Sequence, residues 1–231
     1  MLSINPNYGR YKSCNGVRME YWENRWITGQ TGWHRSAISE LLLKHWPSLE
    51  LNSKSEVFVP LCGKSLDMIW LAENGHTITG VEFTKLAVKT FFQENEIEHE
   101  ITKYSEYQKF SSKKFTILNS DFFDLESEMI HADAWYDRAA MIAVKPSLRR
   151  DYVNQIRRFT KVGAVGLLIT YTYPQNEMEG PPFSLEDEDV YNLFNDGFNV
   201  KPLERIILED ERGRGLSRIS STVFKITRIR N

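Results

Sequence analysis

This sequence has few cysteines, little net charge and no long apolar run. Two cysteines among 231 residues are too few for a disulfide framework or a four-thiolate metal site, so a reducing cytoplasmic location is expected. A formal net charge of -2 argues against a surface that coats nucleic-acid phosphates. No stretch approaches the roughly 18 continuous apolar residues that a membrane span requires. We therefore expect neither nucleic acid nor a membrane as a partner.

The chain is long enough for one large core. A hydrophobic content of 41% over 231 residues is typical of one α/β domain rather than two. Residues 1–18 are polar and rich in turn-forming residues, which predicts a flexible N-terminal arm that would not fold alone. Residues 19–231 are then predicted to form a single domain, and we expect a monomer.

Short apolar runs alternate with segments of helical periodicity. The predicted strands cover residues 57–59, 76–81, 115–118, 134–136 and 164–171, and the predicted helices cover residues 34–46, 65–75, 84–92 and 147–160. This alternation predicts an α/β fold with a doubly wound, mostly parallel sheet. Two extended runs near the end, 201–208 and 221–229, lack a helix between them. They predict an antiparallel pair at the sheet edge, which makes seven strands.

The first predicted strand opens into a tight turn, and the second ends in an acid. The turn is Pro60-Leu61-Cys62-Gly63-Lys64, and the acid is Glu82, which lies 82 minus 63, or 19, positions after Gly63. A glycine turn followed about 20 residues later by an acid that binds ribose hydroxyls is typical of nucleoside sites. The spacing favours a nucleoside ligand held by Glu82.

The turn lacks the dense glycines that bind phosphate. Gly63, Lys64 and Ser65 match the end of a P-loop, but its first glycine would fall on Phe58. A dinucleotide site needs G-x-G-x-x-G, and this turn has one glycine. S-adenosylmethionine has no phosphate, so a single-glycine turn suits it best. The five histidines are scattered without a metal-ligand spacing, so no metal site is expected.

The third and fourth predicted strands also end in polar residues. Asp121 and Phe122 could bind the adenine amino group and cover the ring, or Phe122 could be core and Asp121 could cap a turn. Asp137 and Arg138 place an acid and a base at the mouth of the sheet. A structural ion pair between these two is the alternative to a role in catalysis.

Several of these segments together match one family. Residues 57–82 (VFVPLCGKSLDMIWLAENGHTITGVE), 137–140 (DRAA), 180–183 (GPPF) and 22–34 (WENRWITGQTGWH) resemble bacterial thiopurine S-methyltransferases. The resemblance covers nearly everything after Met19. It implies the Rossmann-like fold of class I S-adenosylmethionine-dependent methyltransferases. It also implies methyl transfer to the sulfur of thiopurines and related aromatic or heterocyclic thiols, with a small-molecule thiol as the partner.

The resemblance also implies roles for individual residues. The positions matching Trp26, Leu61, Glu82 and Arg138 contact the cofactor, with Gly63 in the same turn and Asp121 and Phe122 beside the adenine. Trp22 and Trp33 belong to an aromatic lid over cofactor and acceptor. The expected acceptor contacts are Pro181, Pro182, Phe183, Arg212 and Arg214, although the last two lie in a shorter-looking stretch whose register the sequence does not settle.

The expected chemistry is an in-line displacement that needs alignment and exclusion of water. A heteroaromatic thiol ionises readily, so a nearby cation such as Arg138 would favour the thiolate. Asp137 is a candidate proton acceptor, directly or through water. Two alternatives keep the fold: methylation of selenium or tellurium compounds, and a non-catalytic module that only binds S-adenosylmethionine.

Overall fold

The computed structural model describes residues 20–126, 129–210 and 213–230. A helical segment over residues 20–27 comes first. The named helices that follow are α2 (Glu40–His45), α3 (Asp67–Glu73), α4 (Lys85–Glu94), α5 (Arg149–Phe159) and α6 (Asp187–Leu193). The short 3-10 turns are Trp46–Leu49, Met141–Ala143, Pro146–Leu148 and Gln175–Glu177. The strands are β1 (Glu56–Val59), β2 (Thr77–Val81), β3 (Glu100–Lys103), β4 (Gln108–Ser111), β5 (Phe115–Asn119), β6 (Ala132–Arg138), β7 (Thr160–Ile169), β8 (Phe198–Leu208) and β9 (Ile219–Arg228).

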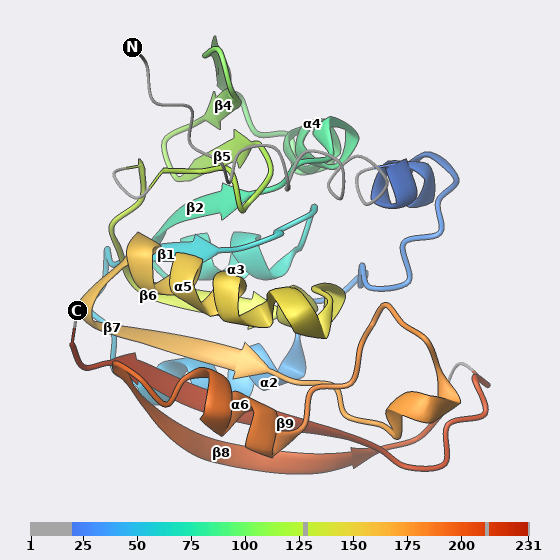
Figure 1. Ribbon diagram of the computed structural model, residues 1–231. Coiled ribbons are helices and arrows are strands. Elements are labelled where there is room, and N and C mark those ends of the chain that lie inside the picture. The colour runs from blue at the N-terminus through green and yellow to red at the C-terminus, as the bar shows by residue number, and fades with distance from the viewer. Residues whose placement is uncertain (1–19, 127–128, 211–212, 231) are drawn as a thin grey trace, which may run out of the picture.

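In the described part of the chain these strands form one mixed sheet of nine, in the order β3-β4-β5-β2-β1-β6-β7-β9-β8 (Figure 1). Strands β5, β2, β1, β6 and β7 run parallel to one another. Strand β9 is antiparallel to β7, and β8 is antiparallel to β9. Strands β4 and β3 extend the other edge, also antiparallel. The prediction of seven strands was therefore too low, and the sheet is mixed, with five of its nine strands parallel to one another.

The missed strands and helix lack the patterns that reveal buried elements. Every residue of β3 is exposed, so no alternation of apolar and polar residues marks it. Helix α6 begins in a run of acids, where Glu186 and Asp189 form a capping box.

Helix α2 begins at Glu40 rather than near residue 34. The backbone N–H of Ser39, just before it, donates to the carboxylate of Asp67, 2.8 Å away.

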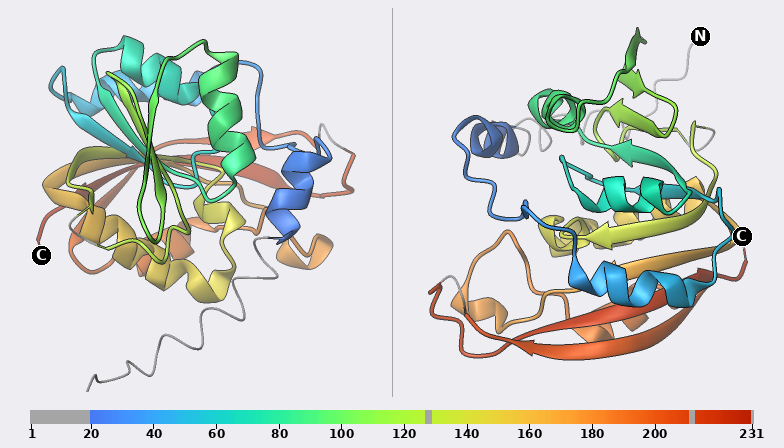
Figure 2. Two further views of the ribbon diagram at one scale, coloured as in Figure 1. Left: turned by 90° about the horizontal axis from the view of Figure 1, so that it is seen from above. Right: turned by 180° about the vertical axis from the view of Figure 1, so that it is seen from behind.

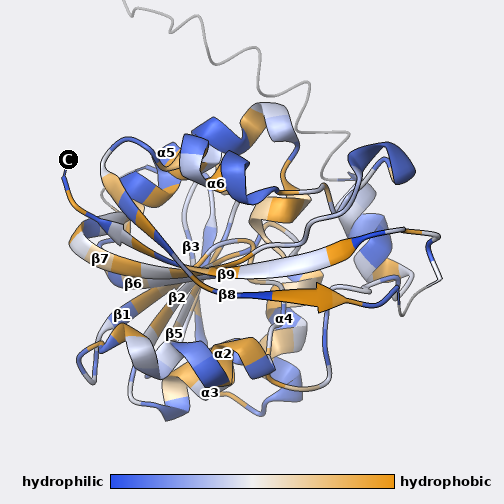
Figure 3. Ribbon diagram, turned by 90° about the horizontal axis from the view of Figure 1, so that it is seen from below, coloured by the Kyte–Doolittle hydropathy of each residue, from blue (hydrophilic) through white to orange (hydrophobic). Residues whose placement is uncertain are grey.

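Alternation along the parallel strands builds two cores, one on each face of the sheet. Val57 and Val59 pack with α2, α3 and α4, whereas Phe58 packs on the opposite face with α5 and α6. The same division separates Tyr136 from Trp135 on β6. Figure 3 shows α5 and α6 on one side of the sheet and α2, α3 and α4 on the other. Successive side chains of a strand point to opposite faces, so a continuous apolar run suits a sheet covered on both sides.

The helical segment 20–27 lies beyond the carboxyl ends of the parallel strands (Figures 1 and 2). Among the described residues, no helix is both long and apolar enough to cross a membrane.

Trp135 fills the core only because Gly166 on the neighbouring strand has no side chain. A Cβ on Gly166 would lie 1.9 Å from the Trp135 ring, and that ring is fully buried. We expect Gly166→Ala to lower the free energy of unfolding by about 1–3 kcal/mol, the usual cost of overpacking. Urea denaturation measures this loss. Trp135→Phe should relieve the clash. The double variant should therefore lose less free energy of unfolding than the two single variants lose together. Simple additivity would contradict this account.

Candidate active site

A cavity of about 640 Å³ lies at the carboxyl ends of the parallel strands. Its walls include residues that follow four neighbouring strands: Leu61 after β1, Glu82 after β2, Arg138 at the end of β6, and Thr170 after β7. The helical segment 20–27 and the loop after it supply a further part of the wall. In α/β sheets ligands bind in this position, beyond the carboxyl ends of the strands.

The turn after β1 and the acid after β2 meet, as the spacing predicted. The Gly63 backbone N–H donates to Oε2 of Glu82 over 3.0 Å, and the Thr84 backbone N–H donates to Oε1 over 2.7 Å. Glu82 is only 5% exposed, and burial raises the pKa of its carboxyl, although these N–H groups act in the opposite direction. A cavity wall thus holds a carboxylate in fixed orientation.

Gly63 itself is not part of the cavity wall, unlike the prediction that it belongs with the cofactor contacts. It lies behind the wall, where a Cβ would come within 3.1 Å of the Trp26 ring. Its φ of 53° is also in the left-handed region that favours glycine. The glycine therefore serves the site indirectly, because it holds Glu82 and leaves room for Trp26.

Two residues of the cavity wall have left-handed backbones without being glycine. Leu61 has a φ of 45° and Ala139 a φ of 67°, and both line the cavity. Such conformations cost free energy and gather at ligand sites. They occur here where the chain leaves β1 and β6, so the strain lies at the strand ends that form the wall.

An aromatic cluster covers the cavity on the side of the 20–27 segment. The rings of Trp22 and Trp33 lie edge to face with centroids 5.0 Å apart, and those of Trp26 and Trp33 lie 5.7 Å apart. The Arg25 guanidinium lies 5.6 Å from the Trp33 ring and 5.4 Å from the Tyr21 ring. All five side chains line the cavity, so the three tryptophans lie together at one wall.

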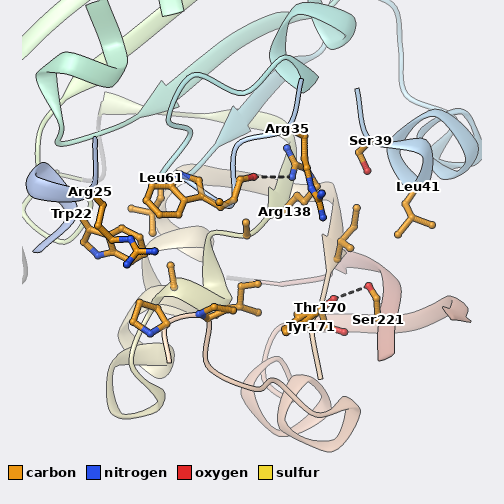
Figure 4. Close-up of a pocket in the computed structure, with 18 of the residues that line it drawn as sticks. Trp22, Arg25, Arg35, Ser39, Leu41, Leu61, Arg138, Thr170, Tyr171 and Ser221 are labelled. Atoms are coloured by element: carbon orange, nitrogen blue, oxygen red, sulfur yellow. Dashed lines mark hydrogen bonds between the residues drawn. The ribbon is translucent and has the colours of Figure 1, made fainter. Parts of the chain in front are cut away.

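Arg138 lines the cavity (Figure 4). Its Nε donates to Oδ2 of Asp67 over 2.6 Å, and its other nitrogens donate to Ser65 Oγ over 3.3 Å and to the Trp33 carbonyl over 3.5 Å. Burial opposes the charged form, but Tyr136 and Asp67 outweigh it and raise the pKa of Arg138. Arg138 therefore presents a permanent cation to the cavity.

Asp137 does not lie on the cavity wall. It points to the opposite face of β6, where one oxygen accepts from Tyr152 Oη over 2.6 Å and the other accepts from the backbone N–H groups of Ala140 and Met141. It forms no ion pair with Arg138, whose partner is Asp67. The predicted role of Asp137 as a direct proton acceptor does not fit this placement, and neither does the predicted alternative of an Asp137–Arg138 pair.

The end of β5 brings a different aromatic to the cavity than the one predicted. Asp121 lines the cavity together with Phe123, and Oδ1 of Asp121 accepts the Phe123 backbone N–H over 3.0 Å. Phe122 is buried instead, with its ring stacked on Phe58 at 6.2 Å between centroids. The core alternative for Phe122 therefore holds, because adjacent residues point in different directions.

Some of the predicted acceptor residues reach the cavity and others do not. Pro181, Pro182 and Arg214 line it. Phe183 does not, because its ring packs over Gly180, where a Cβ would lie 2.6 Å from it, and its N–H donates to the Ile142 carbonyl. Arg212 lies outside the described residues.

The structure adds cavity residues that the sequence reasoning missed. They comprise two cations and a group of polar and apolar side chains, Arg25, Arg35, Ser39, Leu41, Thr170, Tyr171 and Ser221 (Figure 4). Thr170 and Tyr171 could have been found, since they lie at the carboxyl end of the predicted parallel strand 164–171. Nothing local marks Arg35 or Ser39, which the chain reaches through an irregular loop.

The burial of Asp137 predicts a loss of folding stability that depends on pH. Burial raises the pKa of this carboxyl from 3.8 to about 6, against the effect of the Tyr152 hydrogen bond. The folded chain thus binds the proton more tightly than the unfolded chain, so stability falls as the pH rises from about 4 to about 6. Asp137→Asn removes this loss. Its stability relative to the wild type should grow by about 3 kcal/mol between pH 4 and pH 7, measured by urea denaturation.

Asp133 gives a control of opposite sign. Despite partial burial, its pairing with Lys161 lowers the pKa of this carboxyl, so Asp133→Asn should lose stability relative to the wild type as the pH rises. A pH-independent difference for Asp137→Asn would contradict the assigned environment.

Comparison with known proteins agrees with this arrangement. The sequence model of the thiopurine S-methyltransferase family matches residues 17–229. A curated thiopurine S-methyltransferase from Shewanella pealeana is 41% identical over 217 residues, which cover 92% of this chain and 99% of that protein. One from Nitrosomonas eutropha is 39% identical and covers 91% of this chain and 98% of its own length.

Solved structures share the fold at low identity. A 1,6-didemethyltoxoflavin-N1-methyltransferase from Burkholderia thailandensis, solved with S-adenosylhomocysteine, has a TM-score of 0.64 at 12% identity and covers 99% of this chain and 92% of its own. An N-methyltransferase from Bradyrhizobium japonicum has a TM-score of 0.57 at 9% identity and covers 81% of this chain and 83% of its own. The fold is that of α/β methyltransferases, and the chain belongs to the thiopurine S-methyltransferase family.

Proposed function

We propose that this protein transfers the methyl group of S-adenosylmethionine to the sulfur of a thiopurine or a related aromatic thiol. The observation that carries the proposal is one cavity in which the buried carboxylate of Glu82 and the cation of Arg138 both line the wall. The carboxylate suits the hydroxyls of a nucleoside, and the cation suits an ionised acceptor. Membership of the family supplies the reaction class.

The cofactor fits the side of the cavity that Glu82 and Asp121 line. Each Glu82 oxygen accepts one backbone N–H and keeps a further lone pair, which can accept a ribose hydroxyl. Asp121 and Phe123 offer an acceptor and a ring face for adenine. Leu61 and Trp26 supply apolar surface beside them. The bound cofactor would supply a methyl group on a positively charged sulfur.

The acceptor fits the side lined by Pro181, Pro182 and Arg214. A thiol must lose its proton before it can attack, and a nearby cation favours the thiolate. Arg138 provides that field, so no carboxylate base in the cavity is required. The tryptophan cluster covers the cavity and excludes water, which strengthens electrostatic interactions within it.

The comparisons do not favour the two alternatives from the sequence. The curated relatives bear the name of a thiol methyltransferase, rather than that of a selenium or tellurium methyltransferase or of a binding module. We further propose that residues 19–231 act as one domain, in a monomeric cytoplasmic protein without nucleic-acid or membrane partners. Size-exclusion chromatography with light scattering tests the monomer.

The function is tested by binding and turnover together. Calorimetric titration of the full chain with S-adenosylhomocysteine should show one site. Incubation with S-adenosylmethionine and 6-mercaptopurine should give the S-methyl product by mass spectrometry, whereas selenite in place of the thiol should give much less methylated product. Binding without turnover on any aromatic thiol would support the binding module instead. The absence of binding would refute the cofactor.

Glu82→Gln tests whether the Glu82 carboxylate binds the cofactor. An amide cannot accept both N–H groups and both ribose hydroxyls, and hydrogen bonds to a charged group are worth about 1.5–3 kcal/mol. We expect the affinity for S-adenosylhomocysteine to fall about 10–100-fold, measured by calorimetry. Glu94→Gln is the matched control, because Glu94 is 51% exposed and pairs with Lys64 beside the same turn. Equal affinities for Glu82→Gln and the wild type would contradict the assigned role.

A further inference from the structure

A second buried acid, Asp67, lies behind the cavity wall. It is the first residue of α3 and is 1% exposed. Its Oδ1 accepts the Ser39 backbone N–H over 2.8 Å. Its Oδ2 accepts Tyr136 Oη over 2.9 Å and Arg138 Nε over 2.6 Å. Both oxygens of this carboxylate therefore have partners, and the partners come from two separate segments, the loop before α2 and strand β6.

Strand alternation explains why Asp67, and not the neighbouring acid, holds the arginine. Tyr136 and Arg138 are two residues apart on β6 and point to the same face, where α3 packs, whereas Asp137 points to the other face. Arg138 is 18% exposed by its side chain. The arginine side chain has several rotatable bonds. Its guanidinium therefore keeps one orientation only if a fixed anion pairs with it.

The same carboxylate ties down part of the cavity rim. The loop between Trp33 and Ser39 contributes Trp33, Arg35 and Ser39 to the wall. At one end of this loop the Trp33 carbonyl accepts from Arg138, and at the other end the Ser39 N–H donates to Asp67. Arg138 and Asp67 are themselves paired, so the loop is fastened at both ends to one buried ion pair.

We propose that Asp67 is a positioning residue for methyl transfer: it sets the direction of the Arg138 guanidinium and fastens the 33–39 loop to the cavity. This rests on the proposed function, in which Arg138 faces the thiol. Asp67 does not line the cavity, so in the proposed function it would contact neither the cofactor nor the thiol. Its effect on the reaction must therefore pass through Arg138 and the loop, which makes it separable from a general role in folding.

A double-mutant cycle separates positioning from stability. We expect Asp67→Asn, which keeps the shape of the side chain, to lower kcat/KM for the thiol on the order of 10–100-fold, the size of effect that follows from misplacing one group. Arg138→Ala should lower it at least as much. The double variant should lose much less than the product of the two single losses, because Arg138, through which Asp67 acts, is already absent and only the contact with the Ser39 N–H is left to lose. A merely structural role would give additive losses.

Asp133→Asn is the matched control, since Asp133 lies on the same strand but pairs with the exposed Lys161. It should change kcat/KM less than about threefold, because it lies outside the network. Wild-type kinetics for Asp67→Asn, or additive losses in the cycle, would overturn the inference while leaving the proposed function intact. A wild-type protein that binds no S-adenosylhomocysteine and methylates no thiol would overturn the function and the inference together.

Arg138→Lys keeps the proposal testable if Asp67→Asn does not fold. Lysine retains the charge and can pair with Asp67 but lacks the rigid planar fork. If the oriented guanidinium matters, kcat/KM for the thiol should fall nearly as far in Arg138→Lys as in Arg138→Ala. Full activity of Arg138→Lys would mean that charge alone suffices, which would overturn the positioning role.

Discussion

The parallel pairing of β1, β2, β6 and β7 is the constraint on which the site depends. Parallel strands end at the same edge of a sheet, so residues far apart in sequence arrive side by side there. Leu61, Glu82, Arg138 and Thr170 meet around one cavity for this reason. Two apolar cores, one on each face of the sheet, pack against these strands.

Two buried acids on opposite sides of β6 show how environment divides similar groups. Asp67 lies against the Arg138 guanidinium and forms an ion pair with it. Asp137 receives only a hydroxyl and two backbone N–H groups, so burial raises its pKa to about 6. The first acid orients a cation that lines the cavity, and the second braces the turn after β6. Neither is itself exposed to the cavity.

Much of the site was readable from local signals. Glu82 was predicted from its spacing to Gly63, and the hydrogen bond between them confirms that the two positions meet. The errors concerned which way a side chain points rather than which segment of the chain reaches the site. Phe122 and Phe123 both follow β5, yet only Phe123 lines the cavity, since which of two adjacent rings turns inward depends on the core they pack against. Asp67 gave no signal, because its partner Arg138 lies 71 positions away.

The sequence by itself determined the alternation of strands and helices, the acid after the second parallel strand and the family, because these follow from apolar periodicity, spacing and motif. Only the tertiary structure decided which side chains reach the cavity, that the sheet gains the exposed β3 and the partly buried β4 at its edge, and that Arg138 pairs with Asp67 rather than with Asp137. These outcomes depend on contacts between distant segments, and contacts of that kind leave no pattern in either segment alone.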